Sequence, residues 1–148
     1  MRLLPCALLL AACSSSSSPK ITGEDAKQLL IDRNWLDHMP QHEREQMYVY
    51  RFVPSMGGGV FQDRTLFKGT FELFQFEATG DQIRFDLLET GDKVTSHYTI
   101  EEVDGPKPFD IKLTIDADPR GPKVYYGWRS ETDRDGTKLQ QHLATHPK

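Results

Sequence analysis

Histidines spaced four residues apart are the first candidates for chemistry in this sequence. His38 and His42 form one pair, and His142 and His146 form a second pair near the end of the chain. On a helix this spacing places two imidazoles on one face, as a metal-binding pair requires. Pro40 interrupts the first pair, however, and the second lies in a polar tail beside another proline. We therefore expect solvated histidines, with no metal site and no cofactor.

Acidic, hydroxyl and glycine positions are the next candidates. Ser96 and His97 are neighbours on an expected strand, so their side chains point to opposite faces and cannot act as nucleophile and base. The Gly57-Gly58-Gly59 run lacks the lysine and the helix start of a phosphate-binding loop and predicts a mobile hairpin end. Six carboxylates fall mostly on the expected polar faces of strands, where solvation is the simplest role. These are Glu72, Glu77, Asp86, Glu89, Glu101 and Glu102. We predict no catalytic residues and a protein that is not an enzyme.

The aromatic residues are numerous enough to fill a small β-barrel. The ones on expected strands are Tyr48, Tyr50, Phe52, Phe71, Phe74, Phe76, Phe85, Tyr98, Tyr126 and Trp128. Filled and hollow barrels use the same alternation of side chains, so a lined pocket at the barrel mouth is the alternative. In that case Arg51, Tyr98 and Tyr126 are the candidate ligand-binding residues.

The elements that position these residues begin with a short helix over residues 23–32. Thr22 precedes it as an expected cap, and acidic residues follow at the positive end of the helix dipole. Strands are predicted over 48–53, 60–64, 67–78, 83–87, 94–100, 109–115 and 124–128, with Gly-Asp and Pro-Gly turns between them. The pattern is typical of a mainly β protein, in which an antiparallel meander closes into a barrel or sandwich.

Two strands carry more detailed predictions. In 67–78 the apolar side changes midway, from Phe71 and Leu73 to Phe74 and Phe76, which indicates a bulge or a bend. In 124–128, residues Val124, Tyr126 and Trp128 share one side. We expect that side to face the interior, with Trp128 in the core.

The beginning of the chain has its own pattern. A charged Met1-Arg2 precedes an apolar run too short to span a bilayer, and Leu10-Ala11-Ala12-Cys13 ends it. These last four residues resemble the lipobox of bacterial lipoprotein signal peptides. The resemblance implies cleavage before Cys13 and acyl chains, such as palmitate, on that residue. Two acyl chains anchor a protein stably to a membrane, whereas a single acyl chain gives only marginal binding. The serine after the cysteine agrees with the periplasmic face of the outer membrane of a bacterial cell envelope.

Domain organisation follows from that cleavage. Of 148 residues, the signal peptide takes 1–12 and a lipidated, flexible, serine-rich tether takes 13–21. One β-barrel-like domain is expected over 22–136, followed by a polar tail over 137–148. Cys6 leaves with the signal peptide, so the domain has no thiol for a disulfide or a nucleophile and depends on packing alone.

The charges are interspersed along the chain. The full sequence has 18 Lys and Arg against 22 Asp and Glu, and loss of Arg2 leaves 17 against 22. No basic block stands out, so we expect no nucleic-acid partner.

The body of the chain resembles the small bacterial lipocalin-like (calycin-type) domains. The resemblance rests on Trp35 near the domain start, on an Asp-Ile-Lys-Leu-Thr strand from Asp110, and on the Pro-Arg-Gly-Pro-Lys-Val-Tyr-Tyr-Gly segment that ends at Gly127. It implies a membrane-anchored binding module for a small apolar ligand or a protein partner. The alternative is a structural or assembly lipoprotein with a solid core that acts through its surface.

Overall fold

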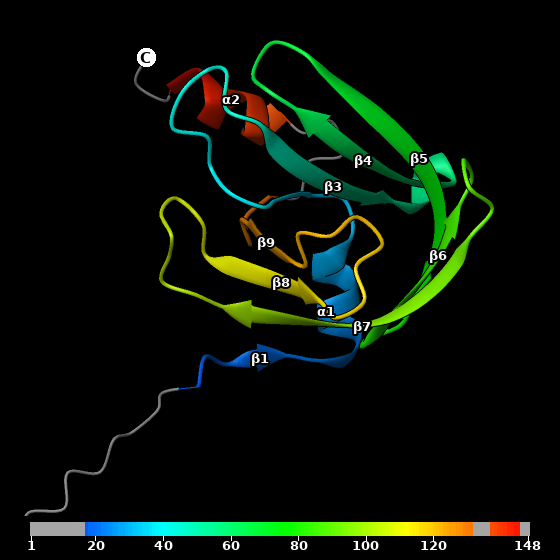
Figure 1. The fold of residues 1–148 in the computed structure, drawn as a ribbon. Helices are drawn as coiled ribbons and strands as arrows, with labels where there is room; N and C mark the ends of the chain where they lie inside the picture. Colours follow the sequence, from blue (N-terminus) through cyan, green and yellow to red (C-terminus); the bar gives the residue numbers. More distant parts are fainter. Residues whose placement is uncertain (1–16, 132–136, 146–148) are drawn as a thin grey trace, which may run out of the picture.

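The protein is a closed antiparallel barrel of eight strands in a meander (Figure 1). The computed structural model describes residues 17–131 and 137–145, so the predicted signal peptide and Cys13 lie outside the described residues. The barrel strands are β2 (Asn34–Leu36), β3 (Met47–Val53), β4 (Gly58–Arg64), β5 (Gly69–Ala78), β6 (Gln82–Leu87), β7 (Lys93–Glu102), β8 (Ile111–Ile115) and β9 (Val124–Gly127). Each strand pairs with the next, and β9 pairs with β2 to close the ring. The mainly β fold and its antiparallel meander are confirmed.

A short strand and a helix precede the barrel. Strand β1 (Lys20–Ile21) pairs with the second half of β7, and helix α1 (Gly23–Leu30) follows it. The helix ends two residues earlier than predicted, and Thr22 makes no capping hydrogen bond through its side chain. Instead, the Trp35 indole Nε1–H donates to the Leu30 carbonyl over 3.0 Å, which satisfies one of the free carbonyls at the end of the helix.

The barrel interior is filled with large side chains. Strand alternation directs one residue in two inward, and the inner side chains of all eight strands form one cluster with Ala26 and Leu30 of α1. The largest fully buried members of this cluster are Trp35, Tyr50, Phe52, Phe74, Phe85 and Tyr125. Figure 1 shows α1 within the outline of the barrel, where its buried residues complete this core.

A second apolar cluster lies on the outside of the barrel, beneath helix α2 (Thr137–Thr145). Leu139 and Leu143 of the helix pack against Met47 and Val49 of β3 and against Trp128. Figure 1 shows α2 outside the barrel, beside β3. The polar tail predicted over 137–148 is therefore wrong in part, because nine of its residues form a docked helix with an apolar stripe.

The prediction for the last strand is correct about burial and wrong about direction. Trp128 is 5% exposed, but it belongs to the outer cluster with Tyr126, and Tyr125 faces the barrel interior. Gly127 also faces inward, where the Trp35 ring leaves no room: a Cβ there would lie 3.1 Å from the ring. The alternation of apolar and polar residues cannot identify the inner face here, because both faces of the strand carry apolar residues. One face lies in the barrel core and the other lies beneath α2.

Of the two causes predicted for the change of side in β5, the bulge is wrong, and the bend agrees with the curvature of β5 in Figure 1. The strand pairs without a skipped residue with β4 from Gly69 to Phe74 and with β6 from Phe74 to Ala78. Phe71 and Leu73 stay on the outer face, 67% and 52% exposed. The apparent change of side comes from apolar residues that remain exposed to solvent.

The run Gly57-Gly58-Gly59 forms a turn and the closely packed start of β4. Gly57 has φ +79 after the short helix η1 (Pro54–Met56), so it takes a conformation that favours glycine. Gly58 and Gly59 begin β4, and a Cβ on Gly59 would lie 2.4 Å from the Phe74 ring. The mobile hairpin end predicted for these three residues is replaced by a turn and a packed strand.

Candidate functional site

Both ends of the filled barrel are covered. At one end, α1 lies where β3 finishes: Ile31 forms a bridge with Phe52, and Gly23 lies against Gly80 in the β5–β6 turn. At the other end, the loop of residues 116–123 between β8 and β9 reaches over the interior. Its contacts define the mouth of the barrel.

Asp118 holds this loop to the interior. Its two carboxylate oxygens accept hydrogen bonds from the hydroxyls of Tyr50, over 2.9 Å, and of Tyr125. They also accept from the backbone N–H groups of Arg120 and Lys123, each over 2.9 Å. Burial raises the pKa of both tyrosines well above the usual range, and the Asp118 charge adds to this effect. Both hydroxyls therefore stay protonated as donors, and the carboxylate fastens the loop.

Arg120 connects the loop to the opposite wall of the mouth. Its guanidinium lies over the Phe61 ring, 5.5 Å from the centroid, and forms an ion pair with Glu72 of β5. Glu72 is half-buried on the inner side of its strand, so the solvated role predicted for it is wrong. Glu101 is also mostly covered, with its side chain 17% exposed and paired with Lys112 over 2.7 Å, so the solvated role is wrong for it as well. The other four carboxylates lie at the surface, some in ion pairs such as Glu77 with Arg84.

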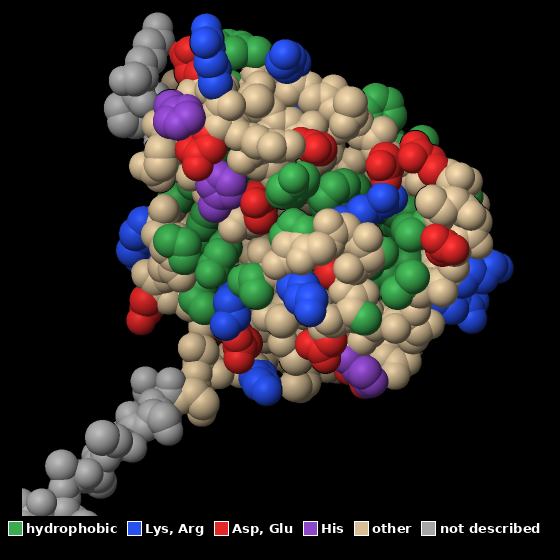
Figure 2. Space-filling model, in the orientation of Figure 1, with side chains coloured by type: hydrophobic (Ala, Val, Ile, Leu, Met, Phe, Trp, Pro, Cys, Tyr) green, Lys and Arg blue, Asp and Glu red, His purple; other side chains and the backbone are tan. Residues whose placement is uncertain are grey.

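A shallow groove of about 590 Å³ runs along the outside of this loop. It is lined by Asp37, Tyr48, Arg120, Gly121, Pro122, Val124 and Tyr126. Two tyrosines, a proline and a valine supply apolar surface, and a carboxylate and a guanidinium supply opposite charges. Figure 2 shows hydrophobic side chains interleaved with acidic and basic ones across this view of the molecule.

The three predicted ligand-binding residues do not come together. Tyr126 lies on the outer face, half-buried, with its ring stacked on Phe109 at 5.6 Å, and it borders the groove. Tyr98 faces the barrel core. Arg51 points outward from β3, into a separate polar cluster. The three side chains thus point to three different regions of the described chain.

That polar cluster joins the barrel to the segment before α2. Glu131, fully buried, accepts hydrogen bonds from the Asn34 backbone N–H over 3.1 Å and from its side-chain amide over 2.7 Å. Asn34 Oδ1 accepts from Arg51 over 3.3 Å, and Arg33 donates to the Trp128 carbonyl over 2.8 Å. Burial raises the pKa of Glu131, although the Asn34 hydrogen bonds and the nearby guanidinium groups oppose this shift. All of these hydrogen bonds are made within the protein, and those of Glu131 and Arg33 attach the segment that follows β9 in the chain to β2 and to the residue before it.

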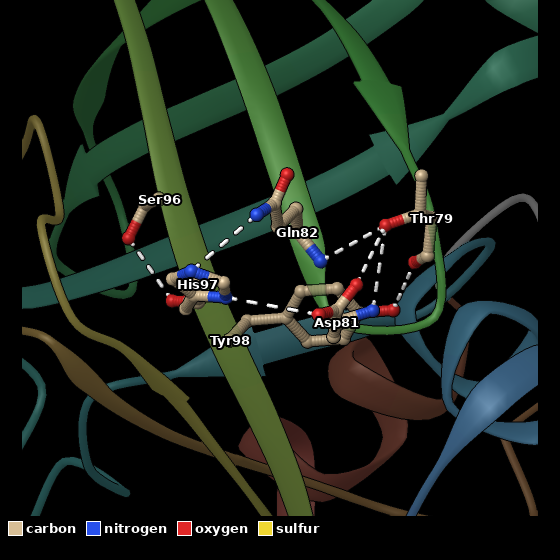
Figure 3. A network of polar contacts seen from close by, with 6 residues as sticks. All are labelled: Thr79, Asp81, Gln82, Ser96, His97 and Tyr98. Carbon is tan, nitrogen blue, oxygen red and sulfur yellow. Dashed lines mark hydrogen bonds and ion pairs between the residues drawn. The ribbon is translucent and has the colours of Figure 1, made fainter.

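Tyr98 belongs to a polar network at the β5–β6 turn (Figure 3). Its hydroxyl donates to the Thr79 carbonyl over 2.6 Å, and burial, with the Asp81 and Glu24 charges, raises its pKa. His97 faces outward, with Nδ1 3.8 Å from an Asp81 oxygen, and both side chains are mainly exposed. The contacts brace a hairpin and enclose no cavity.

Ser96 confirms the expected geometry of the Ser–His neighbours. It is buried on the other face of β7 from His97, and its hydroxyl donates to the His97 carbonyl over 3.0 Å. The Ser96 oxygen accepts from the Ala117 backbone N–H over 2.8 Å. The hydroxyl therefore does not meet the imidazole, and the pair cannot act as nucleophile and base.

The histidine pairs are not equivalent. His38 is partly buried between two carboxylates, with Nδ1 3.0 Å from Asp37 and Nε2 3.1 Å from Glu45, whereas His42 is exposed. His142 is partly buried on α2 and stacks on Trp128 with ring centroids 4.4 Å apart, and His146 lies outside the described residues. Solvation is thus wrong for His38 and His142. Within residues 17–131 and 137–145, no three histidine, cysteine or acidic residues lie together as metal ligands would.

Sequence reasoning missed the residues that hold the mouth and the outer face together. Asp118 lies between the two strands predicted over 109–115 and 124–128, and Glu131 follows the second of them. The Asp118-Pro119-Arg120-Gly121-Pro122 run signals a turn, and nothing in it indicates a tyrosine partner 68 residues away. A local pattern carries no information on contacts of that range.

The comparisons with known proteins return no match. No family model matches this chain, and neither a curated protein nor a solved structure does so. The class that the structure itself defines is a closed, filled, eight-stranded antiparallel barrel with one helix docked outside. In the part of the chain that the structure describes, no helix is long and apolar enough to cross a bilayer.

Proposed function

We propose that this protein is a lipid-anchored, lipocalin-like module of the bacterial envelope that binds a protein partner through its outer surface and catalyses no reaction. The single observation that carries the proposal is the filled barrel. Six aromatic side chains of the inner cluster are less than 2% exposed, and α1 and the Asp118 loop cover the two ends. A small apolar ligand needs an enclosed volume of about 300 Å³ or more. The filled interior favours action through the surface.

The groove beside the Asp118 loop is the surface we assign to the partner. Tyr48 and Tyr126 present rings with polar tips, which suit an interface that is apolar on one side and wet on the other. Pro122 adds rigid apolar surface between them. Asp37 and Arg120 are already paired with His38 and Glu72, so they are held in place as one acidic and one basic point against which a partner of complementary charge can dock. Aromatic residues and arginine carry much of the energy of protein interfaces.

The anchor rests on the lipobox resemblance alone. Lipidation at Cys13 would hold the domain at the membrane, and the serine-rich tether would let the groove face the aqueous compartment. A tethered module meets its partner at a high local concentration, which makes a groove of modest area sufficient.

A photo-crosslinking amino acid placed at Tyr126 in the full chain, in living cells, tests the proposal. We expect one discrete protein adduct from Tyr126 and none from the same group at Thr95, an exposed position on the outer face of β7. The Cys13→Ala variant should leave the membrane fraction and lose the adduct. An adduct with a small molecule, equal labelling from both positions, or an adduct that survives Cys13→Ala would overturn the proposal.

A further inference from the structure

Strand β5 has an open edge over its first half, although the ring of strands is closed. Its residues Gly69–Leu73 pair with β4 on one side, but β6 pairs with β5 only from Phe74 onward. Among the described residues, no strand pairs with 69–73 on the side away from β4. In Figure 1 the upper part of β5 borders β4 alone, above the β6–β7 turn.

The backbone groups on this edge can be assigned from the turns. Thr79 N–H donates to the Gln82 carbonyl, and Thr65 N–H donates to the Lys68 carbonyl. Hydrogen-bonded pairs recur at every second residue of an antiparallel ladder. Both turns then direct the N–H and C=O groups of residues 69, 71 and 73 away from β4. These groups form a ready template for another strand.

The side chains along the same edge are apolar and exposed. Phe71 is 67% exposed and Leu73 is 52% exposed, both on the outer face, and Phe67 in the preceding turn is 73% exposed. Proline, lysine, a bulge or an inward-pointing charge protects such edges in natural sheets. Residues 69–73 contain no proline, lysine or bulge, and their inward-pointing Glu72 is paired with Arg120.

A hollow of about 260 Å³ lies next to the edge. Leu73, Leu88 and Met56 contribute its exposed apolar side chains, and Phe74 and Val53 contribute buried ones. In the described chain, the hollow and the open edge thus form one continuous apolar surface on β4, β5 and the end of β6. In Figure 1, β4 and the upper part of β5 lie at the upper right of the barrel, whereas β1 lies at the bottom.

We propose that this surface binds a second copy of the chain, with the two β5 edges pairing antiparallel about a twofold axis at Phe71. Residue 71 then pairs with its own copy, and Gly69 pairs with Leu73 of the second copy. All the outward N–H and C=O groups find partners in this register. An edge that pairs with itself is isologous and closes as a dimer.

The side chains suit that register. The two Phe71 rings lie directly opposite each other, as a cross-strand aromatic pair. Gly69 leaves room for the Leu73 side chain of the second copy. In this register Phe67 of the second copy falls opposite Gln75, which lines the hollow beside Leu73 and Leu88. Aromatic side chains bury roughly 150–250 Å² each, so the four Phe67 and Phe71 rings supply at most about 600–1,000 Å². The exposed Leu73, Leu88 and Met56 side chains of both copies add to this toward the range of about 1,000 Å² that specific interfaces need.

Sedimentation velocity of the full chain in density-matched detergent tests the proposal. We expect a monomer–dimer equilibrium that depends on protein concentration. Phe71→Lys should raise the dimer dissociation constant by at least about tenfold, because it removes the ring pair and places like charges opposite each other. Thr95→Lys is the matched control, since Thr95 is an exposed outer-face strand residue on β7 and lies outside the edge and the hollow.

Disulfide trapping provides a readout that does not depend on the charge. Phe71→Cys should form a covalent dimer under mild oxidation beyond the baseline of the parent chain, and Thr95→Cys should not. A monomer at every concentration, a dimer that Phe71→Lys leaves unchanged, or equal trapping at both positions would overturn the proposal. If Phe71→Lys fails to fold, the trapping result decides alone. The edge lies apart from the Tyr126 groove, so either proposal can fail without the other.

Discussion

The outer surface of the barrel has two apolar regions, of which one is buried beneath α2 and the other is exposed to solvent. Over β2, β3 and β9, residues such as Val49 and Trp128 are covered by α2 and are at most 5% exposed. Over β5, Phe71 and Leu73 occupy equivalent outward positions and are more than half exposed. The strands look alike in sequence, because both have apolar residues on both faces. What differs is whether a distant part of the chain folds back over them.

This comparison has an energetic meaning. Burial of apolar surface contributes roughly 25 cal/mol per Å², so residues under α2 stabilise the fold, whereas those on β5 contribute little to it. Substitutions in the two regions should therefore separate stability from association.

Trp128→Ala should have the largest effect on stability. The ring packs between Phe109, at 5.0 Å, and His142, at 4.4 Å, beneath the helix. Truncation of a buried tryptophan costs about 3–5 kcal/mol, a large part of a typical 5–15 kcal/mol total. Thermal melting followed by circular dichroism should show a much lower Tm or no cooperative transition. A Tm within a few degrees of the parent would mean that the α2 cluster does not stabilise the fold.

A matched pair of leucine substitutions sharpens the comparison. Leu143→Ala, at 6% exposed on α2, should cost about 2–3 kcal/mol. Leu73→Ala, at 52% exposed on β5, should cost less than about 0.5 kcal/mol. Urea unfolding at a concentration where the protein is monomeric measures both. Equal costs would show that the β5 face is already covered in the monomer.

Glu131→Gln should have a small effect at neutral pH and the clearest dependence on pH. Burial raises the pKa of Glu131 above its ordinary value of 4.5 in the folded protein. The folded state then binds this proton more tightly than the unfolded chain. The stability that this group contributes is fully present below pH 4.5 and is lost as the pH rises through the folded pKa.

Urea unfolding at several pH values above 4 checks this sign. The difference in unfolding free energy between the parent and Glu131→Gln should fall as the pH rises across that window. At pH 7 we expect the two proteins to agree within about 1–2 kcal/mol, because the lost hydrogen bond to Asn34 is offset by removal of a buried charge. A difference that grows with pH would mean that Arg33 and Arg51 outweigh the cost of burial.

Much of the barrel was predictable because its signals are local. The Gly-Asp turn before β6 and the alternation of Ile83, Phe85 and Leu87 identify a strand without any tertiary information. Such positions are set by backbone preferences and by the period of two in a half-buried strand. The strand ends agree with the structure to within a few residues for this reason.

The site was predicted less accurately than the strands, because the mouth of the barrel is formed by loops and strand ends that are far apart in the sequence. Tyr98 and Tyr126 were chosen as aromatic residues with a polar group, and alternation alone could not tell the core from the outer surface. Tyr50 and Tyr125 are the tyrosines that reach the mouth, and they do so because Asp118 folds over them. That contact joins residues separated by 68 positions in the chain for Tyr50.

The sequence by itself determined the meander, the turns and the absence of any cysteine after Cys13, because composition and period of two are properties of neighbouring residues. Only the tertiary structure decided which face of each strand is inside, that β9 returns to β2, that α2 covers one outer face, and that the edge of β5 stays open. Those outcomes depend on the relative lengths of neighbouring strands and on packing between distant segments, and no local pattern records either.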